Sequence, residues 1–277
     1  MNKTYFCSDT HFDHPNILKY EPQRIDFIID YIFNYLDDEI GFLEKLDYLN
    51  KKYGNDLSYI NQYNASVTSQ MIDADDFVRR VIEGVYDDTN FYFEDCTKEE
   101  NDNWHKLQQE QKQVILDYHN EMLIEHWNEV VDVNDVVYFL GDFAFKNKTK
   151  AEILGRRLNG HKIIILGNHD DRKHNQDGSI KYSSTLESHF KSCGFERVEF
   201  NPIILKNKFV LSHEPIFKKE KENIIVHNDI GEFINIYGHV HSNPMFETRT
   251  NDSVCVCLDR HNYEPIEIEE YNKCQIV

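Results

Sequence analysis

Five short apolar runs of this chain end in residues that bind metals or transfer protons. The clearest run, at 163–166, continues into Gly167, Asn168, His169 and Asp170. Four further runs lie at 4–8, 136–140, 208–212 and 233–237, and their polar ends supply Asp9 and His11, Asp142, His213, and His239 and His241. Imidazole, carboxylate and amide groups together form a mixed nitrogen and oxygen donor set for divalent transition metals. The sequence therefore predicts a metal site built from these ends.

The apolar runs themselves predict the elements that position these groups. Runs of four or five apolar residues bounded by turn residues are typical of buried strands, and ligands of open α/β sheets gather at the strands' carboxyl ends. We therefore expect all five polar ends along one edge of a sheet. Asp9 and His11 are two residues apart, as are His239 and His241. In extended backbone such residues share a side, so each pair is expected to hold a common centre.

The polar ends, taken in order, resemble the calcineurin-like metallophosphoesterase superfamily. The motifs are Asp9-x-His11, Gly141-Asp142, Gly167-Asn168-His169-Asp170, His213 and Gly238-His239-x-His241. Together with the segment 258–265 they are most similar to small bacterial and phage phosphoesterases. The resemblance covers residues 1–24 and 118–277. It implies an α/β (α+β) domain in which two mixed β-sheets pack as a sandwich flanked by helices, the four-layer fold of that superfamily.

The resemblance also implies roles for the site residues. One metal ion would be held by Asp9, His11, Asp142 and His241, and the other by Asp142, Asn168, His213 and His239, so that Asp142 bridges two divalent ions. Manganese is expected first, with Fe, Zn, Co and Ni as alternatives. The two ions would supply an acidified water as the nucleophile toward phosphorus. His169 is expected to act as a catalytic general acid or as a donor to the phosphoryl oxygen. Asp170 is a candidate catalytic partner of His169, or a brace for the turn.

The resemblance does not cover residues 25–117, which are predicted to form a mainly helical, acidic insertion. Apolar residues recur at helical spacing at 25–36, 40–49 and 76–82. Thr97-x-x-Glu100 predicts a capping box that opens a long helix reaching Trp127. This segment is interpreted as a solvated bundle, a cap over the metal edge or a homo-oligomer interface. Shorter helices are predicted at 16–20, 149–158 and 184–193.

Composition narrows the partners of the chain. A net charge of −19 over 277 residues argues against a footprint on long duplex nucleic acid and leaves a small phosphorylated substrate, expected to be a nucleotide. No apolar run approaches the roughly 18 residues of a membrane-spanning helix, so no membrane partner is expected. The N-terminus enters a strand almost at once, which leaves no room for a signal peptide. Six cysteines without a CxxC motif predict reduced thiols and a cytoplasmic protein, in the host cytoplasm if phage-encoded.

These observations predict a dinuclear metal phosphodiesterase acting on a small nucleotide-type substrate such as a cyclic nucleotide. A phosphomonoesterase of the same mechanism and a single-strand nuclease are the alternatives, and a non-catalytic binding scaffold is the least favoured. Serine/threonine phosphatases of the superfamily carry Asp three residues after the bridging Asp and Arg after that. Here those positions hold Phe145 and Lys146, which argues against a protein phosphatase.

Overall fold

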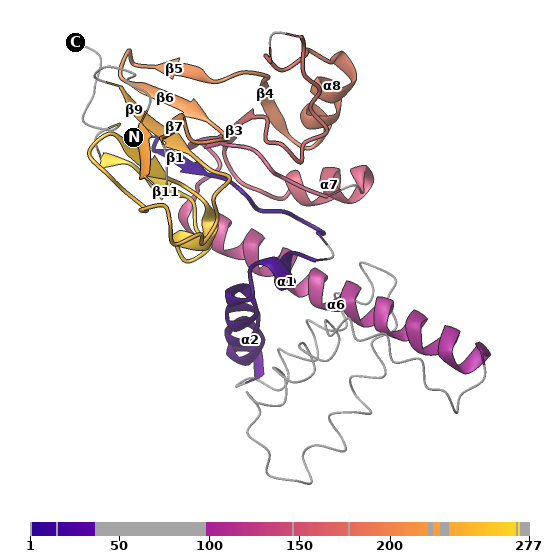
Figure 1. Ribbon diagram of the computed structural model, residues 1–277. Helices are drawn as coiled ribbons and strands as arrows, with labels where there is room; N and C mark the ends of the chain where they lie inside the picture. Colours follow the sequence, from indigo (N-terminus) through magenta and orange to yellow (C-terminus); the bar gives the residue numbers. More distant parts are fainter. Residues whose placement is uncertain are drawn as a thin grey trace. The chain divides into compact units, whose positions relative to one another are not determined.

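The computed structural model describes residues 2–14, 16–36, 98–145, 147–176, 178–220, 224–227, 233–269 and 271 (Figure 1). The chain divides into two compact units, Met1–His14 with Leu123–Val277, and Pro15–Met122. The residues read as an insertion, 25–117, fall within the second unit.

A five-stranded sheet of the first unit carries three of the predicted strands. Its order is β11-β1-β2-β3-β4, with bounds β1 Thr4–Cys7, β2 Val136–Phe139, β3 His161–Ile165, β4 Phe195–Glu199 and β11 Ile266–Glu267. β1 to β4 are parallel, and β11 runs antiparallel beside β1. The carboxyl ends of β1, β2 and β3 therefore meet at one edge.

A four-stranded sheet carries the other two predicted strands. Its order is β10-β9-β6-β5, with bounds β5 Ile203–Leu205, β6 Phe209–Ser212, β9 Ile234–Tyr237 and β10 Ser253–Cys255. β6, β9 and β10 are parallel, and β5 is antiparallel to β6. A separate hairpin joins β7 (Phe217–Glu220) to β8 (Ile224–His227).

The five polar strand ends thus belong to two sheets, and the expectation of a single sheet was wrong. An apolar run identifies a buried strand, but it carries no information about which strand is its neighbour. The chain is a mixed α/β protein with two mixed sheets, as expected. Buried side chains of both sheets form one cluster that includes Phe6, Leu140, Leu211 and Ile236, so the sheets pack face to face.

Helices cover the other face of the five-stranded sheet. Phe139 points away from the second sheet, with its ring centroid 6.2 Å from that of Trp127 and 5.9 Å from that of Phe195. Phe190 packs on Phe195 at 6.0 Å. Tyr138 points the other way and stacks on Phe6 toward the second sheet. Phe139 and Tyr138 thus alternate between the two faces, which is the period of two expected of a strand.

Five helices and one 3-10 turn connect the strands in the described part of the chain. Their bounds are α1 Ile17–Tyr20, α2 Gln23–Leu36, α6 Lys98–Val130, α7 Lys148–Gly155, α8 Ser184–Ser192 and the 3-10 turn Leu258–Arg260. The side chains of Asn147 and Ser183 accept the backbone N–H groups of Lys150 and Leu186 and so cap α7 and α8. The helices predicted at 16–20, 149–158 and 184–193 are confirmed, with α7 ending three residues early.

Two predicted helices that lie largely within the segment 25–117 are also observed. The apolar spacing at 25–36 corresponds to α2, and the predicted long helix to α6. The helices predicted at 40–49 and 76–82, the cap residue Thr97 and Lys146 lie outside the described residues.

No helix among the described residues is both long and apolar enough to cross a bilayer.

Candidate metal centre

The turns that follow the strands hold their polar residues in an unusual backbone conformation. Asp9, His11, Asp142, His239 and His241 all have positive φ, at 62°, 47°, 59°, 71° and 46°. Residues other than glycine adopt this region at a cost, and such residues cluster at functional sites where the surrounding structure fixes them. The backbone of these five residues therefore points to the strand ends as the functional part of the molecule.

This conformation overturns the reasoning from extended backbone. Asp9 and His11 do lie together, but across a left-handed turn and not along a strand. His239 and His241 separate into two different groups of ligands, so the expectation that this pair holds one centre was wrong. The positive φ at both residues shows that the extended backbone assumed for this pair is absent.

The first group of ligands consists of Asp9, His11 and His241, whose donor atoms lie within 4.8 Å of one another. Nε2 of His11 is 3.2 Å from Nε2 of His241 and 3.8 Å from Oδ1 of Asp9. Nε2 of His241 is 3.6 Å from the same Asp9 oxygen. Side chains from the ends of β1 and β9, in different sheets, thus converge on one point.

The second group consists of Asp142, His213 and His239, joined by Asn168. Oδ1 of Asn168 is 2.8 Å from Nε2 of His213 and 2.9 Å from Nδ1 of His239. The two imidazole nitrogens are 3.2 Å apart. At metal–ligand bonds of about 2.0–2.2 Å, neighbouring ligands lie roughly 3.0–3.5 Å apart. These separations therefore fit a single small cation.

One carboxylate connects the two groups. Oδ2 of Asp142 is 3.7 Å from Nε2 of His11 and 3.4 Å from Nε2 of His213. Its other oxygen accepts the backbone N–H of His169 at 2.8 Å. Asp142 therefore lies between the two groups, at the position that the resemblance gives to a bridging ligand.

Neighbouring acceptors fix the protonation of two of the imidazoles. Nδ1 of His213 lies 2.7 Å from the carbonyl oxygen of Leu140, and Nδ1 of His241 lies 2.8 Å from Oδ2 of Asp259. Each Nδ1 must carry a hydrogen to make these bonds, so in the neutral ring each Nε2 presents a lone pair. Those lone pairs face other acceptors, which is unfavourable unless a cation lies between them.

The pKa shifts in the second group of ligands also point to a cation between its members. Burial opposes a charged His213, but its hydrogen bond with Asp142 and the charges of Asp9 and Asp142 raise its pKa to about 9. Burial likewise opposes a charged Asp142, yet its hydrogen bond with His213 and the charges of His213 and His11 hold its pKa well below the ordinary value. Burial and the charge of His213 lower the pKa of His239. A proton on His213 occupies the place that a metal ion would take.

Two glycines allow the turns after β2 and β3 to approach closely. A Cβ on Gly167 would collide with the carboxylate and backbone of Asp142, and one on Gly141 would collide with the backbone of Gly167. Gly141 also has a φ of 89°, which only glycine adopts without strain. The Gly141-Asp142 and Gly167-Asn168 motifs thus reflect a packing need as well as a chemical one.

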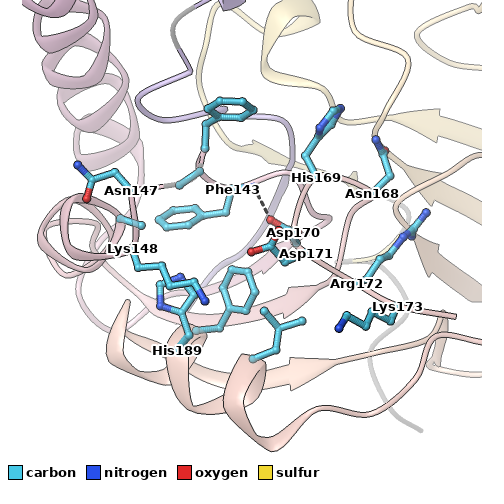
Figure 2. A pocket seen from close by; sticks show the side chains of 15 residues that line it. Phe143, Asn147, Lys148, Asn168, His169, Asp170, Asp171, Arg172, Lys173 and His189 are labelled. Carbon is cyan, nitrogen blue, oxygen red and sulfur yellow. Dashed lines mark hydrogen bonds between the residues drawn. The ribbon is translucent and has the colours of Figure 1, made fainter.

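Asp170 braces these two turns. Its Oδ2 accepts the backbone N–H groups of Asp142 at 2.9 Å and Gly167 at 2.7 Å. Its Oδ1 accepts that of Phe143 at 3.1 Å (Figure 2). The side chain is buried, and burial together with the charge of Asp142 raises its pKa to about 6. These contacts are the ones expected if Asp170 braces the turn.

His169 is exposed at the mouth of the site. Its ring centroid lies 5.5 Å from that of His11 and 6.4 Å from that of His14. It also lines a cavity beside the metal ligands, where Figure 2 shows its side chain next to Asn168. An exposed imidazole at this position can reach a bound molecule, as a proton donor must.

Sequence reasoning missed two residues that hold His241 in place, Asp259 and Arg260. Asp259 orients His241, as described above, and its side chain is fully buried. Arg260 donates from Nε to the carbonyl oxygen of His241 at 2.5 Å, and from Nη2 to that of Asn243 at 2.6 Å. The sequence did offer one sign of them, because the resemblance includes the segment 258–265. It gave no role to the consecutive acidic and basic residues there.

Comparisons with known proteins add a relative but no activity. No protein-family profile matches the chain. The chain is 32% identical over 156 residues to a Methanocaldococcus jannaschii protein described as "Uncharacterized protein MJ1445", a match covering 54% of this chain and 71% of that protein. A crystal structure of a "Protein of Unknown Function AQ665" from Aquifex aeolicus aligns with 99% of this chain and 100% of its own, at a TM-score of 0.46 and 17% identity.

Proposed function

This chain belongs to the family of the Methanocaldococcus jannaschii protein MJ1445, and from the geometry of its own site we propose a function. We propose that it is a dinuclear metal-dependent phosphodiesterase that hydrolyses a small nucleotide-type substrate. The proposal includes membership of the calcineurin-like metallophosphoesterase superfamily and its four-layer sandwich. Two divalent ions are the proposed cofactors, manganese first, with Fe, Zn, Co and Ni as alternatives.

The observation that carries the proposal is the sharing of Asp142 between two groups of inward-facing donors. Oδ2 of Asp142 lies within 3.7 Å of His11 Nε2 and 3.4 Å of His213 Nε2. Asp9 and His241 complete the first group, and the second is completed by Asn168 and His239. Two cations bridged by one carboxylate are the usual arrangement for in-line displacement at phosphorus.

When bound, two such cations supply an acidified water as nucleophile and positive charge beside the phosphoryl oxygens. The remaining work falls to the chain's own residues. His169, exposed beside the ligands, can give a proton to the leaving oxygen or donate to a phosphoryl oxygen. Asp170 holds the turns that carry Asp142 and Asn168 at a fixed separation through its three backbone hydrogen bonds.

A small substrate fits the charge of the molecule better than a long nucleic acid does. The chain has a net charge of −19, which opposes the binding of a long polyanion. Metal ions at the site reverse the field only locally. A phosphodiester of nucleotide size experiences mainly that local field.

Hydrolysis of two synthetic esters tests the proposal. Protein dialysed against EDTA and then supplied with Mn²⁺ should hydrolyse bis(p-nitrophenyl) phosphate faster than p-nitrophenyl phosphate. Asp142→Asn should reduce both rates to background, while Asp252→Asn, which changes a carboxylate outside the site, should leave them unchanged. Preference for the monoester would replace the diesterase with a phosphomonoesterase. No hydrolysis of either ester with Mn²⁺, Fe²⁺, Zn²⁺, Co²⁺ or Ni²⁺ would contradict a phosphoesterase.

A further inference from the structure

A cavity of about 450 Å³ opens beside the metal ligands. It lies between α7, α8 and the segment that follows β3, and it shares Asn168 and His169 with the candidate centre (Figure 2). Its volume falls in the range of about 300–1,000 Å³ that small ligands occupy in proteins. Because His169 is the proposed proton donor, a molecule in this cavity would sit on the side of the leaving group.

The floor of the cavity is apolar. Phe143, Leu186 and Phe190 line it and are buried at 0%, 8% and 3% exposure. Phe145, which is partly exposed, lines it as well. Apolar and aromatic walls of this kind favour a flat ring over a solvated chain of hydroxyl groups.

The rim of the cavity is cationic. Lys148 lines it from α7, and Arg172 and Lys173 line it from the segment after β3, on the other side of the pocket in Figure 2. Arg172 is held by the carboxylate of Glu214. Among the residues that the structure describes, Lys148 and Lys173 form no ion pair, and both are exposed. Asp171 is the exposed carboxylate at this rim, so the two lysines exceed it by one positive charge.

Such an excess of cations is unexpected in a chain with a net charge of −19. Two lysines that are left without acidic partners, on opposite walls of one cavity, provide a site for an anion. His189 lies at the same wall as Lys148, and burial and that lysine lower its pKa, which makes it a weaker candidate for binding an anion. The anion would therefore be bound by Lys148 and Lys173.

Resting on the proposed function, we propose that this cavity is the leaving-group subsite and that it takes a nucleoside carrying a second phosphate, remote from the scissile one. The base and sugar lie over Phe145 and the apolar floor, and the second phosphate is bound by Lys148 and Lys173. The substrate class is then a short 5′-phosphorylated oligonucleotide, of which a 5′-phosphorylated dinucleotide is the smallest member.

The reaction of such a dinucleotide balances as a simple hydrolysis. The oxygen of one water molecule forms a bond to the internal phosphorus, and the bond from phosphorus to the 3′ oxygen breaks. The 3′ oxygen takes a proton from His169, which later recovers one from the water that has been consumed. The products are two nucleoside 5′-monophosphates, one of which leaves from the cavity.

Binding to the metal-free protein tests the subsite separately from catalysis. Calorimetric titrations in EDTA should show adenosine 5′-monophosphate binding at least about tenfold more tightly than adenosine, the value of one charge-assisted hydrogen bond. The Lys148→Gln/Lys173→Gln double variant should lose that difference. Lys181→Gln, which removes an exposed lysine that does not line the cavity, should keep it.

The same three proteins are then assayed with Mn²⁺ on a 5′-phosphorylated dinucleotide and its unphosphorylated counterpart. The wild type and Lys181→Gln should favour the phosphorylated substrate in kcat/KM by about tenfold or more, and the double variant should favour neither. Equal binding of the monophosphate and adenosine overturns the subsite, as does a preference that survives in the double variant. If bis(p-nitrophenyl) phosphate is not hydrolysed while the monophosphate is still bound through the lysines, the phosphoesterase proposal fails and the anion site stands.

Discussion

At the scale of single residues, the candidate centre depends on side chains that are held in place by others. His213 and His241 each use Nδ1 to bond an acceptor, the carbonyl of Leu140 and the carboxylate of Asp259. This leaves Nε2 directed at the other ligands, the arrangement common among metal-binding histidines. A change in the supporting residue should therefore be felt at the metal.

The first residue-scale prediction concerns that support. Asp259→Asn removes the negative charge behind His241 and should weaken Mn²⁺ binding by about 10- to 100-fold, measured by calorimetric titration. Asp252→Asn alters a carboxylate in the loop before β10 and should bind Mn²⁺ as the wild type does. Unchanged Mn²⁺ affinity in Asp259→Asn would show that the negative charge behind His241 has no effect on the metal.

The second residue-scale prediction separates proton donation from metal binding. His169→Gln should lower kcat for a dinucleotide by about 10²- to 10⁴-fold, because the leaving alkoxide needs a proton. The loss should be much smaller for bis(p-nitrophenyl) phosphate, whose leaving phenolate needs none. His174→Gln, an exposed histidine of the following loop, is the matched control. An equal loss on both esters would exclude His169 as the general acid.

At the scale of elements, Asp170 is the connection between the turns after β2 and β3. It accepts N–H groups from Asp142 and Phe143 in one turn and from Gly167 in the other. In Asp170→Asn, one acceptor becomes a donor and must face a buried N–H group. We expect the free energy of unfolding to fall by about 1–3 kcal/mol, measured by urea denaturation.

The exposed neighbour of Asp170 provides the control for this variant. Asp171 has a φ of 57°, a conformation that asparagine also tolerates. Asp171→Asn should therefore unfold at nearly the same urea concentration as the wild type. An Asp170→Asn protein that is as stable as the wild type would mean that the turns do not depend on this brace.

The strands were predictable from sequence, but their pairing was not. Apolar runs identified β1, β2, β3, β6 and β9 almost to the residue, since a strand buried on both faces must be apolar throughout. The pairs Asp9/His11 and His239/His241 were predicted from extended backbone, because the residue types alone did not reveal their positive φ. That conformation, seen at Asp9 and His239 among others, determines which side chains meet.

At the scale of the whole molecule, the ligands come from both sheets. β1, β2 and β3 contribute from the five-stranded sheet, and β6 and β9 from the four-stranded one. The seven candidate ligands were predictable from the sequence because the order of their motifs resembles that of the metallophosphoesterase superfamily. Their division between two sheets followed only from the structure.

The cavity beside His169 was beyond the reach of sequence reasoning for a different reason. Its lysines, Lys148 and Lys173, lie in separate segments and follow no periodic pattern, so nothing in the sequence relates one to the other. Overall composition even argued the opposite, since the chain is strongly acidic. Local charge at a site is set by the fold, and the substrate proposal rests on that local charge.

The position of manganese ions in crystals of the Mn²⁺-loaded protein tests the central claim most directly. Anomalous scattering should give two peaks per chain separated by about 3.5–4 Å, one among Asp9, His11 and His241 and the other among Asn168, His213 and His239. The carboxylate of Asp142 should lie between them. One peak, or none within reach of Asp142, would contradict a dinuclear centre.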